Sequence, residues 1–142
     1  MSKLWRIAHS CAKKTGLFKY LSRFLELLYF IINGNAISVQ ATIGNNTTFH
    51  HHGCGCVVHA NAIIGDNCHI FSNVTLGSRW SNGKLDGGAP IIGNHVLIGT
   101  GAVILGNIKI GDNVNIGANA VVLKDVPDDS IAVGVPAKIH RR

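Results

Sequence analysis

The chain has 142 residues, of which 46% are apolar, with 17 Gly, 3 Pro and a formal net charge of +6. This length and composition fit one soluble domain with an N-terminal appendage and exclude two independent cores. Residues 1–33 hold six basic side chains and one acid, whereas residues 34–142 hold seven bases and six acids. The second part is nearly neutral and lacks a basic stripe with interleaved aromatics, which argues against nucleic-acid binding.

Residues 1–33 are predicted to form a short helical segment. Its apolar run at 17–32, LFKYLSRFLELLYFII, is interrupted by Lys19, Arg23 and Glu26, so the uncharged part is too short to span a bilayer. A basic amphipathic helix either lies on an anionic membrane surface or packs on the end of the following domain and on sister subunits. Both alternatives stay open from the sequence.

No small-residue cleavage site follows this run, which argues against a secretory signal. The chain has four cysteines and no CxxC pair, which favours a reducing cytoplasm, with contact at the inner membrane surface as one alternative. All four are expected to be small buried or half-buried residues, namely Cys11, Cys54, Cys56 and Cys68.

Apolar residues recur every sixth position through residues 34–142. They are Ile43, Phe49, Val58, Ile64, Ile70, Leu76, Ile92, Ile98, Ile104, Ile110, Ile116 and Val122. This period fits neither a helix nor a hairpin, but it fits short strands joined by regular corners, three to a coil. The sequence predicts an all-β solenoid, a parallel β-helix whose coils supply each other's core. The residue two places earlier is usually small or β-branched, and Thr47 is interpreted as only a neighbour of this pattern.

The corners of the solenoid carry turn residues. Gly44-Asn45-Asn46, Gly65-Asp66-Asn67, Gly93-Asn94 and Gly111-Asp112-Asn113 follow the strands. These residue types are expected there because they tolerate positive φ or bond locally to the backbone.

Two interruptions of the period are the candidate functional segments. The step from Phe49 to Val58 is nine residues long and contains three consecutive histidines at 50–52. The step from Leu76 to Ile92 is sixteen, so residues 78–90, SRWSNGKLDGGAP, form a protruding loop that can reach a neighbouring subunit. Consecutive histidines on a strand point to opposite faces and chelate poorly, so no metal site is expected, and His50, His59, His69 and His95 are interpreted as structural or exposed.

Three segments resemble the hexapeptide-repeat acetyltransferases, in particular serine acetyltransferases and the short capsule and colanic-acid acetyltransferases. They are HHGCGCVVHANAIIGDNCHIFSNVTLGS, IGTGAVILGNIKIGDNVNIGANAVVL and DVPDDSIAVGVPAK, and the resemblance covers residues 36–139. It implies a left-handed parallel β-helix, a homotrimer, and acetyl-CoA as co-substrate in the groove between subunits.

The resemblance also implies a histidine general base that takes the proton of the acceptor hydroxyl. Counting back from VTLG without gaps places this base at His52, whereas counting forward from Ile43 places it at His51. The carboxylate that often steadies this histidine would fall at Ala36. Either Asn35, a backbone carbonyl or a neighbour's Asp86 orients the ring, or the catalyst is weaker than its relatives.

The acetyl-CoA site is expected along glycine-rich corners. Gly77 and Ser78 are candidate backbone donors to the oxyanion. Small residues where the pantetheine arm would pass the backbone are Gly99, Thr100, Gly117 and Ala118, and candidate partners of the CoA phosphates are Lys124, Lys138, Arg141 and Arg142.

The acceptor is expected to be a sugar. Serine acetyltransferases have an Arg-His pair before the proline of the long loop, where this chain has Gly88-Ala89-Pro90. An aromatic face with planar polar groups suits hydroxyl-rich rings, and the loop offers Arg79, Trp80, Asn82 and Asp86. The predicted function is O-acetylation of a sugar in surface-polysaccharide biosynthesis. The alternatives are serine O-acetylation, N-acetylation of an amino sugar, and a solenoid without activity.

Overall fold

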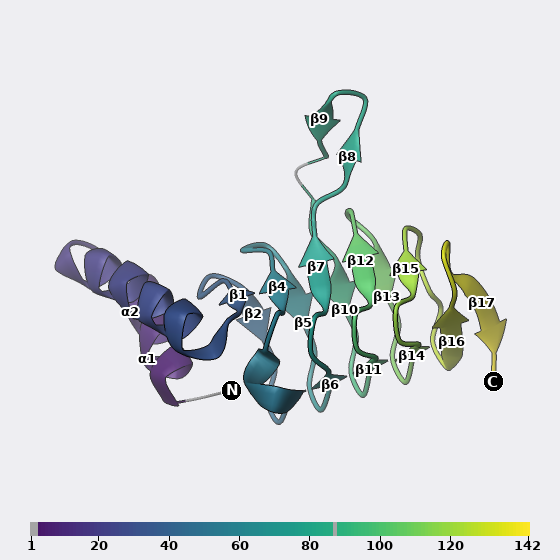
Figure 1. Ribbon diagram of the computed structural model, residues 1–142, viewed down its shortest axis with the longest axis horizontal. Coiled ribbons are helices and arrows are strands. Elements are labelled where there is room, and N and C mark those ends of the chain that lie inside the picture. The colour runs from purple at the N-terminus through teal and green to yellow at the C-terminus, as the bar shows by residue number, and fades with distance from the viewer. Residues whose placement is uncertain (1–2, 87) are drawn as a thin grey trace.

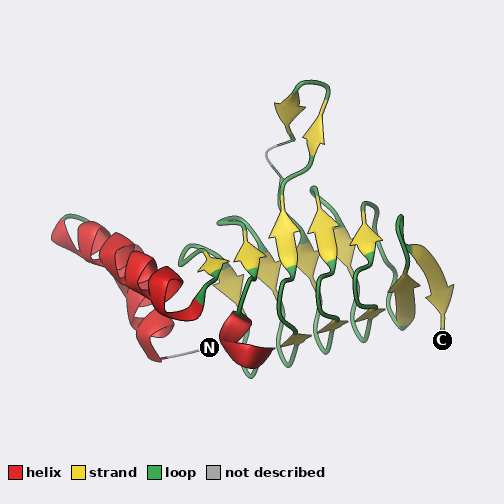
Figure 2. Cartoon of the chain, viewed as in Figure 1, coloured by secondary structure: helices red, strands yellow, loops and turns green. Residues whose placement is uncertain are grey.

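The computed structural model describes residues 3–86 and 88–142, so Met1, Ser2 and Gly87 of the predicted helical segment and loop lie outside the described residues. The chain begins with α1 (Lys3–Ala12) and α2 (Leu17–Asn33), which lie together at one end of a long coil of short strands (Figure 1). Figure 2 shows that regular helix is confined to this end, apart from one short turn beside the first strands.

The coil is built of three parallel sheets, which successive strands visit in turn. The first sheet contains β1 (Ala36–Ile37), β4 (Val57–Val58), β7 (Thr75–Gly77), β12 (Val103–Leu105) and β15 (Val121–Val122). The second contains β13 (Lys109–Ile110), β10 (Ile91–Ile92), β5 (Ile63–Ile64) and β2 (Thr42–Ile43). The third contains β17 (Lys138–Arg141), β16 (Ser130–Val133), β14 (Asn115–Ile116), β11 (Leu97–Ile98), β6 (His69–Ile70) and β3 (Thr48–Phe49), with β17 antiparallel to β16. The predicted parallel coils are therefore present.

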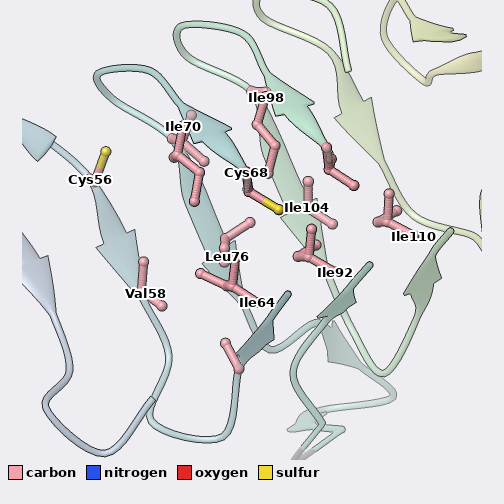
Figure 3. Packing of buried hydrophobic residues seen from close by; sticks show 14 of the residues in the cluster. Cys56, Val58, Ile64, Cys68, Ile70, Leu76, Ile92, Ile98, Ile104 and Ile110 are labelled. Atoms are coloured by element: carbon pink, nitrogen blue, oxygen red, sulfur yellow. The ribbon is translucent and has the colours of Figure 1, made fainter. Parts of the chain in front are cut away.

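The register stacks the apolar residues of the six-residue period on one another. Ile70 pairs with Ile98, and Ile98 pairs with Ile116, so one column of side chains fills the interior. Figure 3 shows Ile70 and Ile98 pointing into the interior of the coil. Ile70, Ile98 and Ile116 are each 0% exposed. A coil alone has no such column, so burial depends on stacking.

Thr47 corrects one prediction about this pattern. Its side chain is buried, and its hydroxyl donates to the carbonyl of Gly65 at 2.7 Å and accepts from the N–H of Cys68 at 3.1 Å. Thr47 therefore occupies one of the inward small positions, since these two hydrogen bonds satisfy the only polar group it brings into the core.

The glycines of the Gly-Asp-Asn corners have a different role from the one predicted. A Cβ on Gly44 would lie 2.5 Å from the carbonyl oxygen of Gly65, and one on Gly65 would lie 2.5 Å from that of Gly93. The positive φ predicted for these corners is adopted two residues later, at Asn46 and Asn67, both with φ of 56°. The glycines are thus required by the close approach of successive coils.

The Asp and Asn side chains of these corners bond to the preceding coil rather than locally. Asp66 Oδ1 accepts from the N–H of Asn45 at 2.5 Å, and Asn94 Oδ1 accepts from that of Asp66 at 2.9 Å. Asp112 Oδ1 accepts from the N–H of Asn94 at 2.6 Å, and Asp128 Oδ1 from that of Asp112 at 2.8 Å. A ladder of side-chain acceptors therefore joins successive coils along this edge.

The two helices close the open end of the first coil. The indole N–H of Trp5 donates to the carbonyl of Ile37 at 3.3 Å, and Glu26 Oε1 accepts from the N–H of Val39 at 3.0 Å. α2 ends at Gly34, whose φ of 62° and N–H bond to the carbonyl of Phe30 form a left-handed C-cap. Backbone groups of the first coil thereby gain partners that a preceding coil would otherwise supply.

The corner stacking can be tested by replacing Gly65 with alanine. We expect Gly65→Ala to lower the free energy of unfolding by about 1–3 kcal/mol, because the new methyl group overlaps the Gly93 carbonyl. Gly77→Ala is the matched control, since its Cβ would meet Leu105 at an ordinary 3.4 Å. Urea unfolding monitored by circular dichroism measures both, and equal stability of the two variants would contradict the stacking argument.

Candidate active site

The histidine triplet lies where the chain passes from the third sheet to the first. This corner is made by the short 3-10 helix η1 (His50–Gly53) in the first coil, and by residues 71–74, 99–102 and 117–120 in later coils. The residues that precede these corners, Phe49, Ile70, Ile98 and Ile116, are paired in register in the third sheet. The corners therefore form one row along an edge of the three-sided coil, or prism. The extra residues predicted at this step therefore enlarge one corner without disturbing the stack.

The backbone of the enlarged corner has an unusual conformation. His51 has φ 52° and ψ 38°, His52 has φ 58° and ψ 18°, and both side chains are exposed. The left-handed region costs a residue with a side chain about 1–2 kcal/mol. Gly53, with φ of 70°, continues the turn and is buried. The two candidate bases are therefore presented to solvent by a strained turn instead of lying on opposite faces of a strand.

Asn35 holds this turn through its backbone. The side chain is 2% exposed, and its Nδ2 donates to the carbonyl of His52 at 2.9 Å. Its Oδ1 is buried and has no hydrogen-bond partner among the described residues. Asn35 therefore fixes the main chain at His52, and neither of its side-chain polar atoms bonds to the His52 ring. Ala36, where the family carboxylate would fall, is an exposed residue of β1.

His50 enters the turn as part of an aromatic cluster with His69 and Phe71. Its ring is stacked on Phe71, with centroids 4.4 Å apart, and its Nε2 lies 3.1 Å from Nδ1 of His69. This cluster anchors the chain immediately before His51, which supports the structural interpretation of His50 and His69. The sequence carried no signal for it, because its members lie in different coils.

Four of the predicted acetyl-CoA residues lie on the same row of corners as the histidines. Gly99 and Thr100 follow β11, while Gly117 and Ala118 follow β14. A Cβ on Gly99 would lie 2.6 Å from the backbone N of Ala118, and Thr100 and Ala118 are exposed. The edge that begins with His51 and His52 therefore continues as a line of small corners.

Residues 78–90 leave the coil at a different edge. The segment forms a hairpin of β8 (Trp80–Ser81) and β9 (Lys84–Leu85), with Asn82 and Gly83 at its turn at φ of 51° and 75°. Figure 1 shows it projecting beyond the end of β7, at the edge of the first sheet opposite η1. Asn82 thus serves a tight turn that requires positive φ.

The hairpin base is closed by two of the predicted site residues. Asp86 Oδ1 accepts from the N–H of Arg79 at 3.0 Å and from that of Gly88 at 3.2 Å. The hydroxyl of Ser78 donates to the carbonyl of Gly88 at 2.7 Å. Trp80 remains 67% exposed, so the aromatic face predicted for an acceptor is free within this chain.

One chain does not bring all the predicted residues together. His51, His52 and the corners at 99–100 and 117–118 lie at one edge of the first sheet, whereas Gly77, Ser78, the hairpin and Lys124 lie at the other. Lys138 and Arg141 lie on β17, the last strand of the third sheet, and Arg142 follows it. The width of the first sheet separates the two halves.

The cysteines differ in exposure, which corrects one prediction. Cys54 is exposed, next to the histidine turn, whereas Cys11, Cys56 and Cys68 are buried. Burial raises the pKa of the Cys56 thiol above its ordinary value, partly offset by hydrogen bonds from the backbone of Val74 and Asn73. Burial likewise raises the pKa of Cys68.

Known proteins resemble this chain over nearly its whole length. Residues 89–124 match the family described as bacterial transferase hexapeptide (six repeats). The chain is 43% identical over 123 residues to serine acetyltransferase of Synechococcus elongatus, covering 86% of this chain and 49% of that protein. It is 40% identical over 142 residues to the colanic acid biosynthesis acetyltransferase WcaB of Escherichia coli K12, covering 95% of this chain and 85% of that protein.

Solved structures agree with these relatives. A serine acetyltransferase determined in complex with CoA superimposes with a TM-score of 0.84 at 35% identity, covering 96% of this chain and 54% of that one. The serine acetyltransferase of Neisseria gonorrhoeae superimposes with a TM-score of 0.87 at 38% identity, covering 98% and 52%. The chain thus spans about half the length of these two solved proteins and of the Synechococcus enzyme.

Thiol labelling tests the burial pattern around the turn. We expect iodoacetamide to modify Cys54 at least about tenfold faster than Cys56 or Cys68, because burial shields these two and keeps them protonated. Mass spectrometry of the folded protein reads each site, and Cys54→Ser should abolish the fast phase. Labelling of all four thiols at one rate, equal to that in urea, would contradict the described packing.

Proposed function

This chain belongs to the hexapeptide-repeat acyltransferases, and from that premise we propose that it transfers the acetyl group of acetyl-CoA to a hydroxyl group of a sugar. The proposal rests on the pair of exposed histidines, which lie at the start of a row of corners made of small residues. The imidazoles supply a base, and the corners leave room for an extended thioester arm beside the backbone.

The chemistry proceeds by direct transfer. The neutral imidazole of His52 takes the proton of the acceptor hydroxyl as its oxygen attacks the acetyl carbonyl carbon. The carbonyl oxygen gains negative charge, which backbone N–H groups near Gly77 and Ser78 stabilise. The carbon–sulfur bond then breaks, and the proton held by the imidazole passes to the departing CoA thiolate. His51 is the alternative base, because the strained turn presents both rings.

The turn itself supports this role. Histidine bears a side chain that disfavours the left-handed region, yet two histidines in succession adopt it here. Asn35 and the bond from the Cys54 N–H to the His51 carbonyl, 3.1 Å long, hold the conformation. Strain maintained by surrounding contacts is characteristic of functional sites. Asn35 thus acts as a positioning residue through the backbone.

We further propose that the active site is completed by a second copy in a homotrimer of left-handed coils. Because the first sheet separates the histidine edge from the hairpin edge, the two halves can meet when one chain's hairpin edge faces the next chain's histidine edge. An isolated hairpin is marginally stable in water, and the exposed Trp80 and Leu85 on it gain cover from such packing. The hand is inferred from the family.

We propose that acetyl-CoA binds at the residues that the family resemblance implies. The pantetheine arm would pass Gly99, Thr100, Gly117 and Ala118, and the exposed Lys124 and Lys138 would meet the phosphates. The solved relative named as a complex with CoA supports this co-substrate. Serine is a second candidate acceptor, favoured by the 43% identity to the Synechococcus serine acetyltransferase.

Replacing the candidate base tests the mechanism. We expect His52→Ala to lower turnover by about 100-fold or more, since the proton acceptor is lost, while the mass measured by light scattering is unchanged. His51→Ala is the matched variant from the same turn and should retain most of the activity. Release of CoA thiol, followed with acetyl-CoA and an acceptor glycan, reports the rate. A larger loss in His51→Ala than in His52→Ala would reassign the base to His51.

Filling the row of corners tests the acetyl-CoA site. We expect Thr100→Trp to weaken acetyl-CoA binding by about tenfold or more, because the indole would occupy the path of the pantetheine arm. The control is Asn113→Trp, an exposed residue at a corner between the second and third sheets. Calorimetry gives both affinities, and an unaltered Thr100→Trp affinity would place the arm elsewhere.

The acceptor is identified by comparing CoA release with L-serine and with sugars. We expect turnover on a polysaccharide repeat unit and an acetyl product lost in mild alkali, because an ester hydrolyses there and an amide does not. Turnover with serine alone would assign serine O-acetylation, and a product stable to alkali would assign amino-sugar N-acetylation.

A further inference from the structure

The helical end of the molecule exposes a large apolar face that the coil does not use. On α2, Leu17 is 82% exposed, Tyr20 71%, Phe24 57% and Ile31 65%. Leu17, Leu21, Phe24 and Ile31 follow one another at spacings of four, three and seven residues, which places them on one side of the helix. Contiguous exposed apolar surface of this kind marks an interaction site.

The opposite side of α2 makes the contacts that hold the helix to the rest of the chain. Ser22 and Tyr29 are buried, and Glu26 accepts a hydrogen bond from the N–H of Val39 in the first coil. The exposed face is therefore not needed to attach α2 and is available to an external partner.

Exposed cations lie beside this apolar face, with no exposed acid to balance them. Arg23 is exposed at the flank of the apolar face, next to Phe24. The exposed Lys19, in contrast, is seven residues from Glu26 and lies on the side of α2 that faces away from the apolar face. The ammonium group of Lys14 lies 4.7 Å from the ring centroid of Phe18. Glu26 is the one acid in residues 1–33, and it is turned towards the first coil.

This charge pattern selects the partner. Residues 1–33 carry +5, so packing of this face against the same face of a second copy would bring like charges together without acids to pair them. An anionic bilayer has the complementary charge, and each Lys or Arg near its surface adds to the attraction. No helix among the described residues has the length and apolar character needed to cross a bilayer, so α2 would lie in the plane of the interface.

We propose that the exposed face of α2, with the cations beside it, docks on the surface of an anionic phospholipid membrane. Lys14, which lies between α1 and α2, and Arg23 would reach the headgroups while Leu21, Phe24 and Ile31 insert between the acyl chains. Because η1 belongs to the first coil, next to the helices, docking holds the histidine turn near the lipid surface (Figure 1). The docking itself does not depend on the proposed acetyl transfer.

Vesicle sedimentation of the full chain tests this proposal without acetyl-CoA or acceptor. We expect binding to vesicles of phosphatidylcholine mixed with phosphatidylglycerol to be at least about tenfold tighter than to phosphatidylcholine alone, and to weaken as salt is raised. Equal binding to the two kinds of vesicle, or none to either, overturns the proposal even if the protein is an active acetyltransferase.

Two pairs of substitutions separate the apolar and electrostatic contributions. We expect Phe24→Glu with Ile31→Glu, and separately Lys14→Glu with Arg23→Glu, to weaken binding to the anionic vesicles by about tenfold or more. Val133→Glu with Val135→Glu matches the first pair at exposed residues of the coil, and Lys84→Glu with Lys109→Glu matches the change in charge of the second. Both control pairs should bind as the unsubstituted chain does.

Circular dichroism and light scattering accompany every variant. Equal losses of vesicle binding in the test and control pairs would mean that binding depends only on the net charge of the protein. That result would overturn the proposal that α2 is the docking face. If the chain fails to bind vesicles and Phe24→Glu with Ile31→Glu lowers its mass in solution, the face is an interface between copies and the proposal is also overturned.

Discussion

The structure depends on the vertical fit of one coil on the next. Each strand of the first two coils contributes only two residues, of which one points inward and gains its apolar neighbours from the coils above and below. The fit is tight at the corners, where the glycines at 44 and 65 leave no room for a Cβ against the carbonyl of the next coil. This constraint explains both the six-residue period and the ladder of Asp and Asn acceptors that joins the corners.

The same constraint decides where function can be placed. A stacked coil tolerates extra residues only if they leave at a corner, because a change within a strand would shift every later side chain to the opposite face. The two insertions do leave at corners, one as the histidine turn and one as the hairpin after β7. The rigid stack then supports a conformation at His51 and His52 that a free chain would rarely adopt.

Two features of a single chain, the hairpin edge and the exposed face of α2, are open to partners outside the described residues. The first sheet separates the histidines from the hairpin, and α2 leaves an apolar face without cover. The two features call for different partners. We propose another copy of the chain as the partner of the hairpin and, because residues 1–33 are basic, an anionic surface as the partner of the helices.

The sequence alone predicted the parallel coils, the helical end and the location of both insertions. These follow from the six-residue period, from the two breaks in it, and from the charged residues within the apolar run at 17–32. It also pointed to His51 and His52 through family resemblance, but their left-handed backbone has no sequence signal. Thr47 and the corner glycines were misread, since their roles depend on residues about twenty positions away. The contact of Asn35 with His52, the cluster of His50 with His69 and Phe71, and the separation of the site over two edges were decided only by the tertiary structure. Two of these features join residues 17 or more positions apart, and the third depends on the path of the chain around a coil, so local spacing in the sequence carries no information about them.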